Sequence, residues 1–359
     1  MRVAFRTDAS SQIGTGHVMR CLTLADALRE QGAICQFVCR EHEGNLIDHI
    51  RSCGFEVYAL PKPIANASFE SDLAHAIWLG VDWPTDAQQT LQVLKDTKLH
   101  WLVLDHYALD QSWELALRAS CGRMMVIDDL ADRRHECDLL LDQNYGSSSE
   151  RYLGLVPVEC TQLHGPEFAL LKPIYAQRCV KQSVRNRKIE RVLIYFGGGA
   201  DAMNLTEMAV RAFQAPELKK IELDIVVGSC YVHRAKLETR AAIRGRTCIY
   251  EQLPDLSELI ANADLAIGAG GGTTWERCCL GLPTIVISVA NNQRLTCEAL
   301  ARDGLIQYLG HASDVSAEVI LMQVIELFEK PERLSELSEK GMKLVDGKAT
   351  GKLIDVLTH

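Results

Sequence analysis

Short apolar runs alternate with segments of helical periodicity through residue 127 of the chain. Runs at residues 2–5, 34–38, 56–59, 101–104 and 124–127 are bounded by polar and turn-forming residues, as buried strands are. Between them, apolar residues recur at three- and four-residue spacing in 17–31, 44–52, 85–95 and 112–119, which predicts helices. This alternation is typical of a parallel sheet with helices on both faces.

The alternation stops over residues 139–180, where the pattern predicts loops and one short strand near 161–164. We interpret the basic, polar residues 181–188 as a solvated linker. Strands are then predicted at 191–196, 221–227, 247–250, 265–267 and 284–288, with helices at 202–214, 234–243, 256–261, 274–280 and 293–303. Residues 316–357 predict two or three further helices.

The repeated pattern predicts an α/β protein with two Rossmann-like domains. We expect an N-terminal domain at residues 1–180, a C-terminal domain at 190–342, and a final helix at 343–359 that can pack back towards the N-terminal domain. Ligands of open α/β sheets bind at the carboxyl ends of the strands. We therefore expect the glycine turns of the two domains to face each other across a cleft.

Composition narrows the range of partners. The chain has 359 residues and a net charge of −9, with no long run of Lys or Arg, so neither nucleic acid nor an anionic membrane is the expected partner. No segment has the length of a transmembrane helix, and no signal peptide precedes the first strand, so we expect a cytoplasmic protein. The 13 cysteines form no Cys-x-x-Cys pair and are interpreted as small buried hydrophobes. A monomer is expected because both domains contribute to one cleft.

A glycine-rich turn after the strand at 265–267 has the features of a nucleotide diphosphate site. Its backbone N–H groups and the following helix N-terminus favour a phosphate, and its two hydroxyls can complete the site or cap the helix. Glu276, one turn into the helix, can bind both hydroxyls of a ribose; the alternative is an exposed acid favoured by the helix dipole. The expected phosphate contacts are Gly270, Gly271, Gly272, Thr273 and Thr274.

A second glycine turn follows the first strand. Gly14 and Gly16 precede His17, which falls near the first turn of the predicted helix. A helix N-terminus disfavours imidazolium, so His17 is drawn towards the neutral form that acts as a base. The alternative is a histidine that satisfies a loop carbonyl.

The motifs together resemble the UDP-2,4-diacetamido-2,4,6-trideoxy-β-L-altropyranose hydrolases of pseudaminic acid biosynthesis, which are related to the peptidoglycan N-acetylglucosaminyltransferase and its GT-B fold. The resemblance covers nearly the whole chain. It rests on Arg6-x-Asp8, Gly14-x-Gly16-His17-x-x-Arg20, Asp105-His106-Tyr107, Ile127-Asp128-Asp129, Leu141-Asp142-Gln143-Asn144, Phe196-Gly197-Gly198 with Asp201 and Asn204, Gly268 to Gly271, Trp275-Glu276-Arg277, Gly281-Leu282-Pro283 and Asn292-Gln293.

By this resemblance the reaction is hydrolysis of a UDP-sugar to UDP and the free sugar, without a cofactor. His17 matches the general base of the family, and the C-terminal domain would hold UDP. The implied substrate contacts outside the glycine-rich turn are Arg6, Asp8, Gly16, Arg20, Asp105, Tyr107, Asn144, Gly198, Asn292 and Gln293.

Several of these residues have a structural alternative. Arg6 and Asp8, placed on the first loop, could form a loop salt bridge, and Asp105 and Tyr107 a hydrogen-bond network at a strand end. Asn144 could cap its loop. The amides at Asn292 and Gln293 suit the acetamido groups or the β-phosphate, but Asn291 or Asn292 could instead cap the helix.

Asp128 and Asp129 could together bind a metal, but no third ligand stands at a suitable spacing, so no metal site is expected. Three rival functions remain: a GT-B UDP-sugar glycosyltransferase, a hydrolysing UDP-sugar 2-epimerase, and a UDP-sugar binding subunit. Release of free sugar without an acceptor separates the first rival from the hydrolase.

Overall fold

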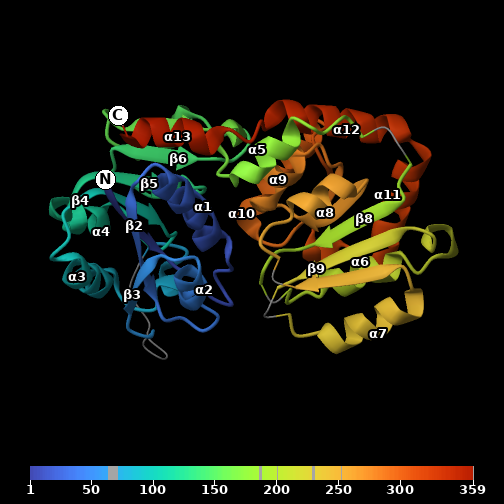
Figure 1. Ribbon diagram of the computed structural model, residues 1–359, viewed down its shortest axis with the longest axis horizontal. Coiled ribbons are helices and arrows are strands. Elements are labelled where there is room, and N and C mark those ends of the chain that lie inside the picture. Colours follow the sequence, from blue (N-terminus) through green and yellow to red (C-terminus); the bar gives the residue numbers. More distant parts are fainter. Residues whose placement is uncertain (64–71, 186–187, 200, 229–230, 252, 359) are drawn as a thin grey trace. The chain divides into compact units, whose positions relative to one another are not determined.

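The computed structural model describes residues 1–63, 72–185, 188–199, 201–228, 231–251 and 253–358 (Figure 1). The chain forms two compact units: Met1–Leu170 with Ala349–His359, and Leu171–Lys348. The second unit therefore begins before helix α5 (Pro173–Cys179), because α5 packs against α8 (Ser257–Asn262) and α9 (Thr273–Cys279) of that unit. Helix α13 (Ala349–Thr358) belongs to the first unit.

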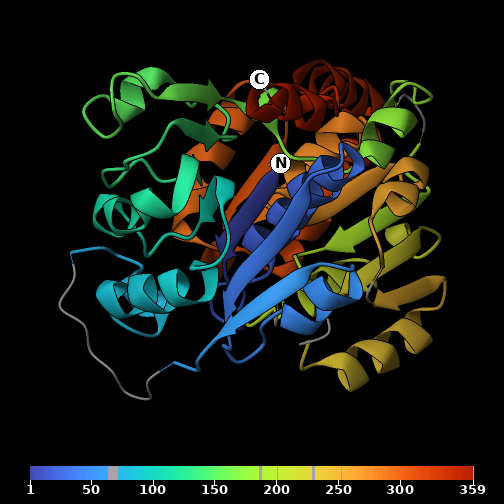
Figure 2. The ribbon, with the colours of Figure 1, turned by 60° about the vertical axis from the view of Figure 1, so that its left-hand side comes forward.

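The first unit contains a seven-stranded sheet in the order β3-β2-β1-β4-β5-β6-β7, and every pair is parallel, which confirms the predicted parallel α/β sheet (Figure 2). Its strands are β1 (Arg2–Thr7), β2 (Ile34–Arg40), β3 (Glu56–Leu60), β4 (Leu99–Asp105), β5 (Cys121–Ile127), β6 (Leu139–Asp142) and β7 (Thr161–His164). Its α-helices, besides α13, are α1 (Gly16–Glu30), α2 (Ile47–Ser52), α3 (Trp83–Leu94) and α4 (Gln111–Leu117). Strand β6 was not predicted.

Alternation along the strands divides the core of the first unit into two layers. Val3 and Phe5 of β1 belong to a cluster that includes residues of α1, α2 and α13. Ala4, between them, belongs to a second cluster that includes residues of α3 and α4. Successive side chains of a strand point to opposite faces, so this sheet is buried on both sides.

The second unit contains a six-stranded sheet in the order β10-β9-β8-β11-β12-β13, again with every pair parallel. Its strands are β8 (Arg191–Tyr195), β9 (Glu222–Val227), β10 (Thr247–Glu251), β11 (Leu265–Ala269), β12 (Thr284–Ser288) and β13 (Gln307–His311). Besides α5, α8 and α9, its α-helices are α6 (Leu205–Ala212), α7 (Arg234–Arg244), α10 (Asn291–Arg302), α11 (Ala317–Glu329) and α12 (Pro331–Leu344). Helix α5 and strand β13 were not predicted.

The stretch at 181–188 is more than a solvated linker, although its residues 186 and 187 lie outside the described residues. Arg185 is only 6% exposed, and its guanidinium donates to the carbonyls of Ile260, Ala261 and Ala263 at the end of α8. These carbonyls have no partner within the helix, so the arginine satisfies them. The basic character of the stretch therefore has a structural role at Arg185.

Both sheets reverse their strand order at an inner pair: β1 with β4 in the first unit, and β8 with β11 in the second. Loops that leave the carboxyl ends of such a pair diverge to opposite sides of the sheet and create a binding crevice. His17 follows β1 and Asp105 ends β4, while Gly198 follows β8 and Gly270 follows β11. The sequence motifs thus lie at the two switch points.

Candidate functional site

In the first unit, His17 is paired with a buried carboxylate. Its Nδ1 lies 2.6 Å from Oδ1 of Asp105, which is fully buried at the end of β4. Burial raises the pKa of a carboxyl, but Arg20 and then His17 outweigh it, so the pKa of Asp105 lies below its usual range. An ionised carboxylate can only accept, so Nδ1 of His17 is the donor and a neutral ring carries its lone pair on Nε2.

Arg20 and Tyr107 complete a cluster around this pair. The guanidinium of Arg20 contacts both carboxylate oxygens of Asp105 at 2.6 Å and Oδ2 of Asp129 at 2.7 Å. The Tyr107 hydroxyl donates to the same Asp129 oxygen at 2.6 Å, and its ring meets the His17 ring edge to face, with centroids 4.5 Å apart. Four predicted residues, His17, Arg20, Asp105 and Tyr107, are therefore brought together.

Asp129 is the member of this cluster to which no role was assigned. It follows β5, the strand beside β4, and this position at the carboxyl edge of the sheet was the available signal. Its neighbour Asp128 has other partners: Arg133 at 2.9 Å and the Tyr152 hydroxyl at 3.0 Å. The two adjacent carboxylates thus belong to different hydrogen-bond networks.

The loops around the cluster add one polar and two aromatic groups. Asn144 donates from its side chain to the carbonyl of Asp129 at 2.9 Å, which fits its loop-capping alternative. Trp78 and His75 lie near Tyr107, with ring centroids 5.8 and 5.5 Å away. Gly16, the first residue of α1, is exposed, and no atom lies within 4 Å of a Cβ built on it, so its backbone is open to a ligand.

Arg6 and Asp8 occupy the interior of the first unit, and Arg6 lies within β1 instead of on the loop. Both are 0% exposed, and they pair with each other at 2.8 Å. Arg6 also donates to both carboxylate oxygens of Asp86 in α3, at 3.1 and 2.7 Å, and Asp86 accepts from Arg40 at 2.6 Å. Their partners are protein groups, so the structure favours the ion-pair alternative over contact with a sugar.

In the second unit, the glycine-rich turn joins β11 to α9. Its glycines allow close packing: a Cβ on Gly270 would come within 2.3 Å of the Cys297 sulfur. Gly271 and Thr273 are partly buried and Gly272 is exposed, so all three remain accessible to a ligand. Thr274 is 1% exposed and its hydroxyl accepts from Arg277 at 3.0 Å, so its contribution is structural.

Glu276 has a carboxylate oxygen without a partner. Its Oε2 is buried and makes no hydrogen bond with any described residue, while its carboxyl is a hydrogen-bond partner of the Tyr175 side chain. Burial raises the pKa of Glu276 to about 7. Tyr175 also accepts from the Leu256 backbone at 3.3 Å, so α5 holds the carboxyl in place. A partly buried acid with a free oxygen is suited to accept ribose hydroxyls.

The raised pKa of Glu276 predicts that any binding of ribose hydroxyls to its carboxylate depends on pH. Ribose hydroxyls bind best to the ionised carboxylate, so binding releases a proton and affinity is lost as the pH falls through about 7. We expect UDP affinity to rise about tenfold between pH 6 and pH 8, the change in ionised fraction for that pKa. Titration calorimetry of wild type and Glu276→Gln checks this, because the variant retains only the titration of UDP itself. Parallel pH profiles for the two proteins would contradict the assignment.

The remaining predicted residues of the second unit lie on the loop after β8 and on the first turn of α10. Gly198 follows β8, and its carbonyl oxygen would lie 2.1 Å from a Cβ on Gly228. Asn292 is exposed on the first turn of α10, whereas the Gln293 side chain accepts from the Val289 N–H at 2.9 Å. The N-cap residue of α10 is Ala290, with no side-chain cap, so neither Asn291 nor Asn292 has the capping alternative.

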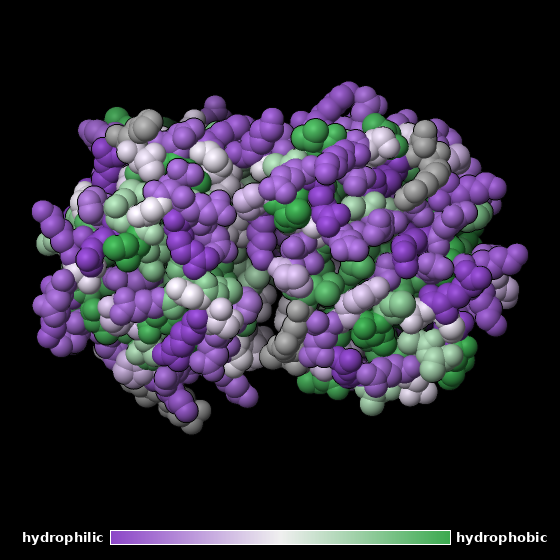
Figure 3. All heavy atoms as spheres, viewed as in Figure 1, coloured by the Kyte–Doolittle hydropathy of each residue, from purple (hydrophilic) through white to green (hydrophobic). Residues whose placement is uncertain are grey.

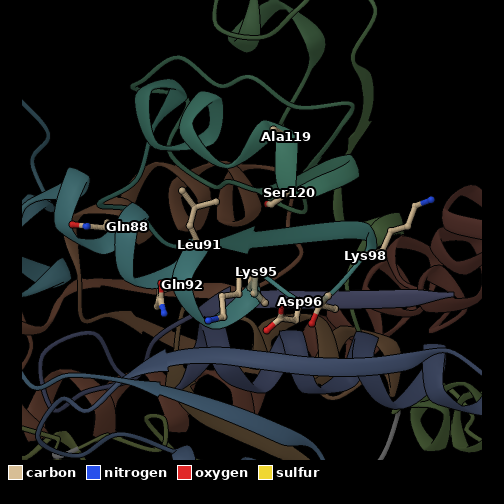
Figure 4. Close-up of a pocket in the computed structure, with 10 residues that line it drawn as sticks. Gln88, Leu91, Gln92, Lys95, Asp96, Lys98, Ala119 and Ser120 are labelled. Atoms are coloured by element: carbon tan, nitrogen blue, oxygen red, sulfur yellow. The ribbon is translucent and has the colours of Figure 1, made fainter.

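A groove in the first unit lies away from these residues. It is lined by Gln88, Leu91, Gln92, Leu94, Lys95, Asp96, Thr97, Lys98, Ala119 and Ser120 (Figure 4). Residues 97–98 precede β4 and residues 119–120 precede β5, so the groove lies at the amino edge of the sheet. Ligands of open α/β sheets bind at the carboxyl edge, where His17 and Asp105 are found.

The helices of the described part of the chain differ from membrane-spanning helices. None of its helices has both the length and the apolar character that a membrane span requires. On the face shown in Figure 3, hydrophobic residues are scattered among hydrophilic ones.

Comparison with protein families and relatives gives a match to most of the second unit and to most of the chain. Residues 192–350 match the glycosyltransferase family 28 C-terminal domain. The chain is 27% identical to the UDP-2,4-diacetamido-2,4,6-trideoxy-beta-L-altropyranose hydrolase of Campylobacter jejuni subsp. jejuni over 304 residues, which cover 85% of this chain and 97% of that protein. It is 24% identical to the spore coat polysaccharide biosynthesis protein SpsG of Bacillus subtilis, over 99% of this chain and 98% of that one.

The fold is shared with solved structures over nearly the whole chain. The crystal structure of MurG from Acinetobacter baumannii superposes with a TM-score of 0.66 at 15% identity, covering 99% of each chain. The predicted GT-B fold is therefore confirmed.

Proposed function

We propose that this GT-B enzyme, whose residues 192–350 match the glycosyltransferase family 28 C-terminal domain, hydrolyses UDP-2,4-diacetamido-2,4,6-trideoxy-β-L-altropyranose to UDP and the free sugar. The name of the Campylobacter jejuni relative supports this substrate, and the motifs shared along the chain agree with it. The single observation that carries the hydrolytic step is the pairing of His17 with Asp105 at 2.6 Å.

In this proposal His17 is the general base. Asp105 holds the Nδ1 proton, so Nε2 is free to take a proton from water. The water oxygen forms a bond to the anomeric carbon as the bond from that carbon to the diphosphate oxygen breaks, and the electron pair leaves with UDP. Attack from the face opposite the leaving group inverts the anomeric configuration. Arg20 would stabilise the buried Asp105 carboxylate throughout.

The second unit would hold the leaving group. A diphosphate is already a weak base, so its departure requires donors that stabilise the developing negative charge more than it requires a general acid. Gly270, Gly271, Gly272 and Thr273 would supply backbone N–H groups to it, and Glu276 would fix the ribose. We further propose Gly198 and the amides of Asn292 and Gln293 as contacts to the phosphate or sugar.

The direct test is an NMR assay with this UDP-sugar in ¹⁸O-labelled water, without an acceptor or added metal. We expect UDP and the free sugar to form together, with the label on the anomeric hydroxyl and none on UDP, and with the inverted anomer appearing first. Label on UDP would mean attack at phosphorus and would reject His17 as the base for attack at carbon. Intact substrate would reject hydrolysis.

A second candidate is transfer of the sugar to an acceptor, which the family 28 domain and the likeness to MurG support. Both reactions use the same nucleotide site and differ in whether water or an acceptor hydroxyl attacks. Substrate that stays intact in the assay above, yet binds and protects the protein against heat, would favour the transferase.

A further inference from the structure

Arg277 is a buried cation for which the described residues offer no carboxylate partner. It lies on α9, directly after Glu276, and is 4% exposed. Its two hydrogen bonds both leave from one nitrogen, Nη2, and its buried Nε donates to none of the described residues. The buried Arg244 differs, because Nε, Nη1 and Nη2 all donate there to backbone carbonyls.

The two bonds of Arg277 hold the two ends of the glycine-rich turn. Nη2 donates to the Ala269 carbonyl at 2.7 Å, just before the turn, and to the Thr274 hydroxyl at 3.0 Å, just after it. A Cβ on Gly268 would lie 2.2 Å from Nη1 and 2.4 Å from the backbone carbonyl oxygen of Tyr195, which cannot move aside as a side chain can, so this strand position requires glycine. The guanidinium therefore lies against the backbone of the turn and fixes its shape.

An unpaired charge in the protein interior is costly, and it is retained where a counter-charge arrives from elsewhere. Burial lowers the pKa of Arg277 to about 10, which leaves the side chain charged at neutral pH. Among the described residues near the turn, Glu276 is the acid whose charge acts on Arg277, and its own raised pKa means that it is only partly ionised there. A bound anion would supply the missing negative charge.

We propose that Arg277 is a positioning residue that provides the buried counter-charge for the diphosphate bound at this turn. The inference rests on the proposed nucleotide site and adds a residue that acts from beneath the turn, without contact to the nucleoside. It predicts that the effect of Arg277 scales with the charge of the phosphates and is absent for uridine.

The test compares wild type with Arg277→Met and Arg277→Lys by titration calorimetry, using UDP, uridine and inorganic pyrophosphate. We expect Arg277→Met to weaken UDP and pyrophosphate binding by about tenfold or more, as loss of a charge-assisted interaction does, and uridine binding by less than about threefold. Arg277→Lys keeps the charge but loses the planar guanidinium. Its affinity for UDP should therefore lie between those of wild type and Arg277→Met. Without ligand, Arg277→Met loses two hydrogen bonds but also removes an uncompensated buried charge, so its unfolding midpoint should stay close to that of wild type.

The outcomes separate this inference from the nucleotide assignment. Equal losses for UDP and uridine, with a destabilised apo-protein, would mean that Arg277 only supports the fold. Unchanged UDP affinity in Arg277→Met would also overturn the inference. A third outcome is a protein that does not bind UDP but binds pyrophosphate in a way that depends on Arg277. This outcome would reject the nucleotide site and support Arg277 as the counter-charge for a bound diphosphate. If Arg277→Met does not fold, the comparison of UDP with uridine in Arg277→Lys decides.

Discussion

Replacement of His17 by alanine should lower turnover of the UDP-sugar by about 10²–10⁴-fold, the usual contribution of a positioned general base. UDP affinity should stay within about threefold, because the proposed nucleotide contacts come from the second unit. The imidazole is 8% exposed and its Nδ1 is fixed by Asp105, so it is preorganised to act through Nε2. Single-turnover release of UDP, followed by NMR, measures the first effect, and titration calorimetry the second.

The matched control is His49→Ala, which removes an exposed histidine from α2 of the same unit. Its turnover should equal that of wild type. Full activity in His17→Ala would remove the general-base assignment. A loss of UDP affinity as large as the loss of turnover would instead show that His17 acts in binding.

Replacement of Asp86 by asparagine should destabilise the first unit by about 3–5 kcal/mol, the cost of breaking a buried ion pair on one side. Asp86 is fully buried and accepts from Arg6, from Arg40 and from the Trp113 indole. The variant leaves Arg40 without a carboxylate and Arg6 with Asp8 alone. Urea unfolding followed by tryptophan fluorescence measures this, because four of the five tryptophans lie in the first unit.

Asp26→Asn is the matched control, because its ion pair with Arg29 is about 40% exposed on either side and is expected to contribute less than about 1 kcal/mol. The pKa of Asp86 is lowered: burial opposes this, and Arg6 and Arg40 outweigh it. Its stabilisation is therefore present at neutral pH and is lost as the pH falls below the ordinary carboxyl range. Equal unfolding midpoints for Asp86→Asn and Asp26→Asn would contradict the role of the network.

The elements predicted from periodicity are those with long, regular patterns. Strands β1, β2 and β4 and helix α1 were located to within about three residues, because each combines a buried apolar run or stripe with clear turn signals. Strand β6 has only four residues, buried on both faces, and no alternation marks such a segment. Helix α5 begins with Pro173 and has a single fully buried side chain, Tyr175, so its apolar stripe is too short to detect.

The residues of the candidate site also fall into those that could be predicted from the sequence and those that could not. His17 was predicted from its place after the first glycine turn, and Arg20, Asp105 and Tyr107 from the family resemblance. The carboxyl edge of the parallel sheet brings the four together. Arg6 and Asp8 are also near this end of β1, but Asp86, the partner of Arg6, comes from a helix 80 residues away, and sequence spacing does not reveal such a pairing. Similarly, the position of Glu276 could be predicted, whereas its raised pKa depends on burial that only the folded chain creates.

The return of α13 to the first unit bears on how the protein is made. Leu353 and Leu357 belong to the core that contains α1, and the Leu357 carbonyl accepts from the Trp101 indole at 2.9 Å. These groups follow the second unit along the chain, so the first unit completes its core only after the second has been synthesised. A fragment that ends at Leu170 lacks this helix and exposes the apolar surface beneath it, whereas residues 171–348 form a continuous piece of chain. Dissection of the enzyme into separately expressed halves should therefore begin with the second unit, and a first-unit fragment needs α13 grafted after Leu170.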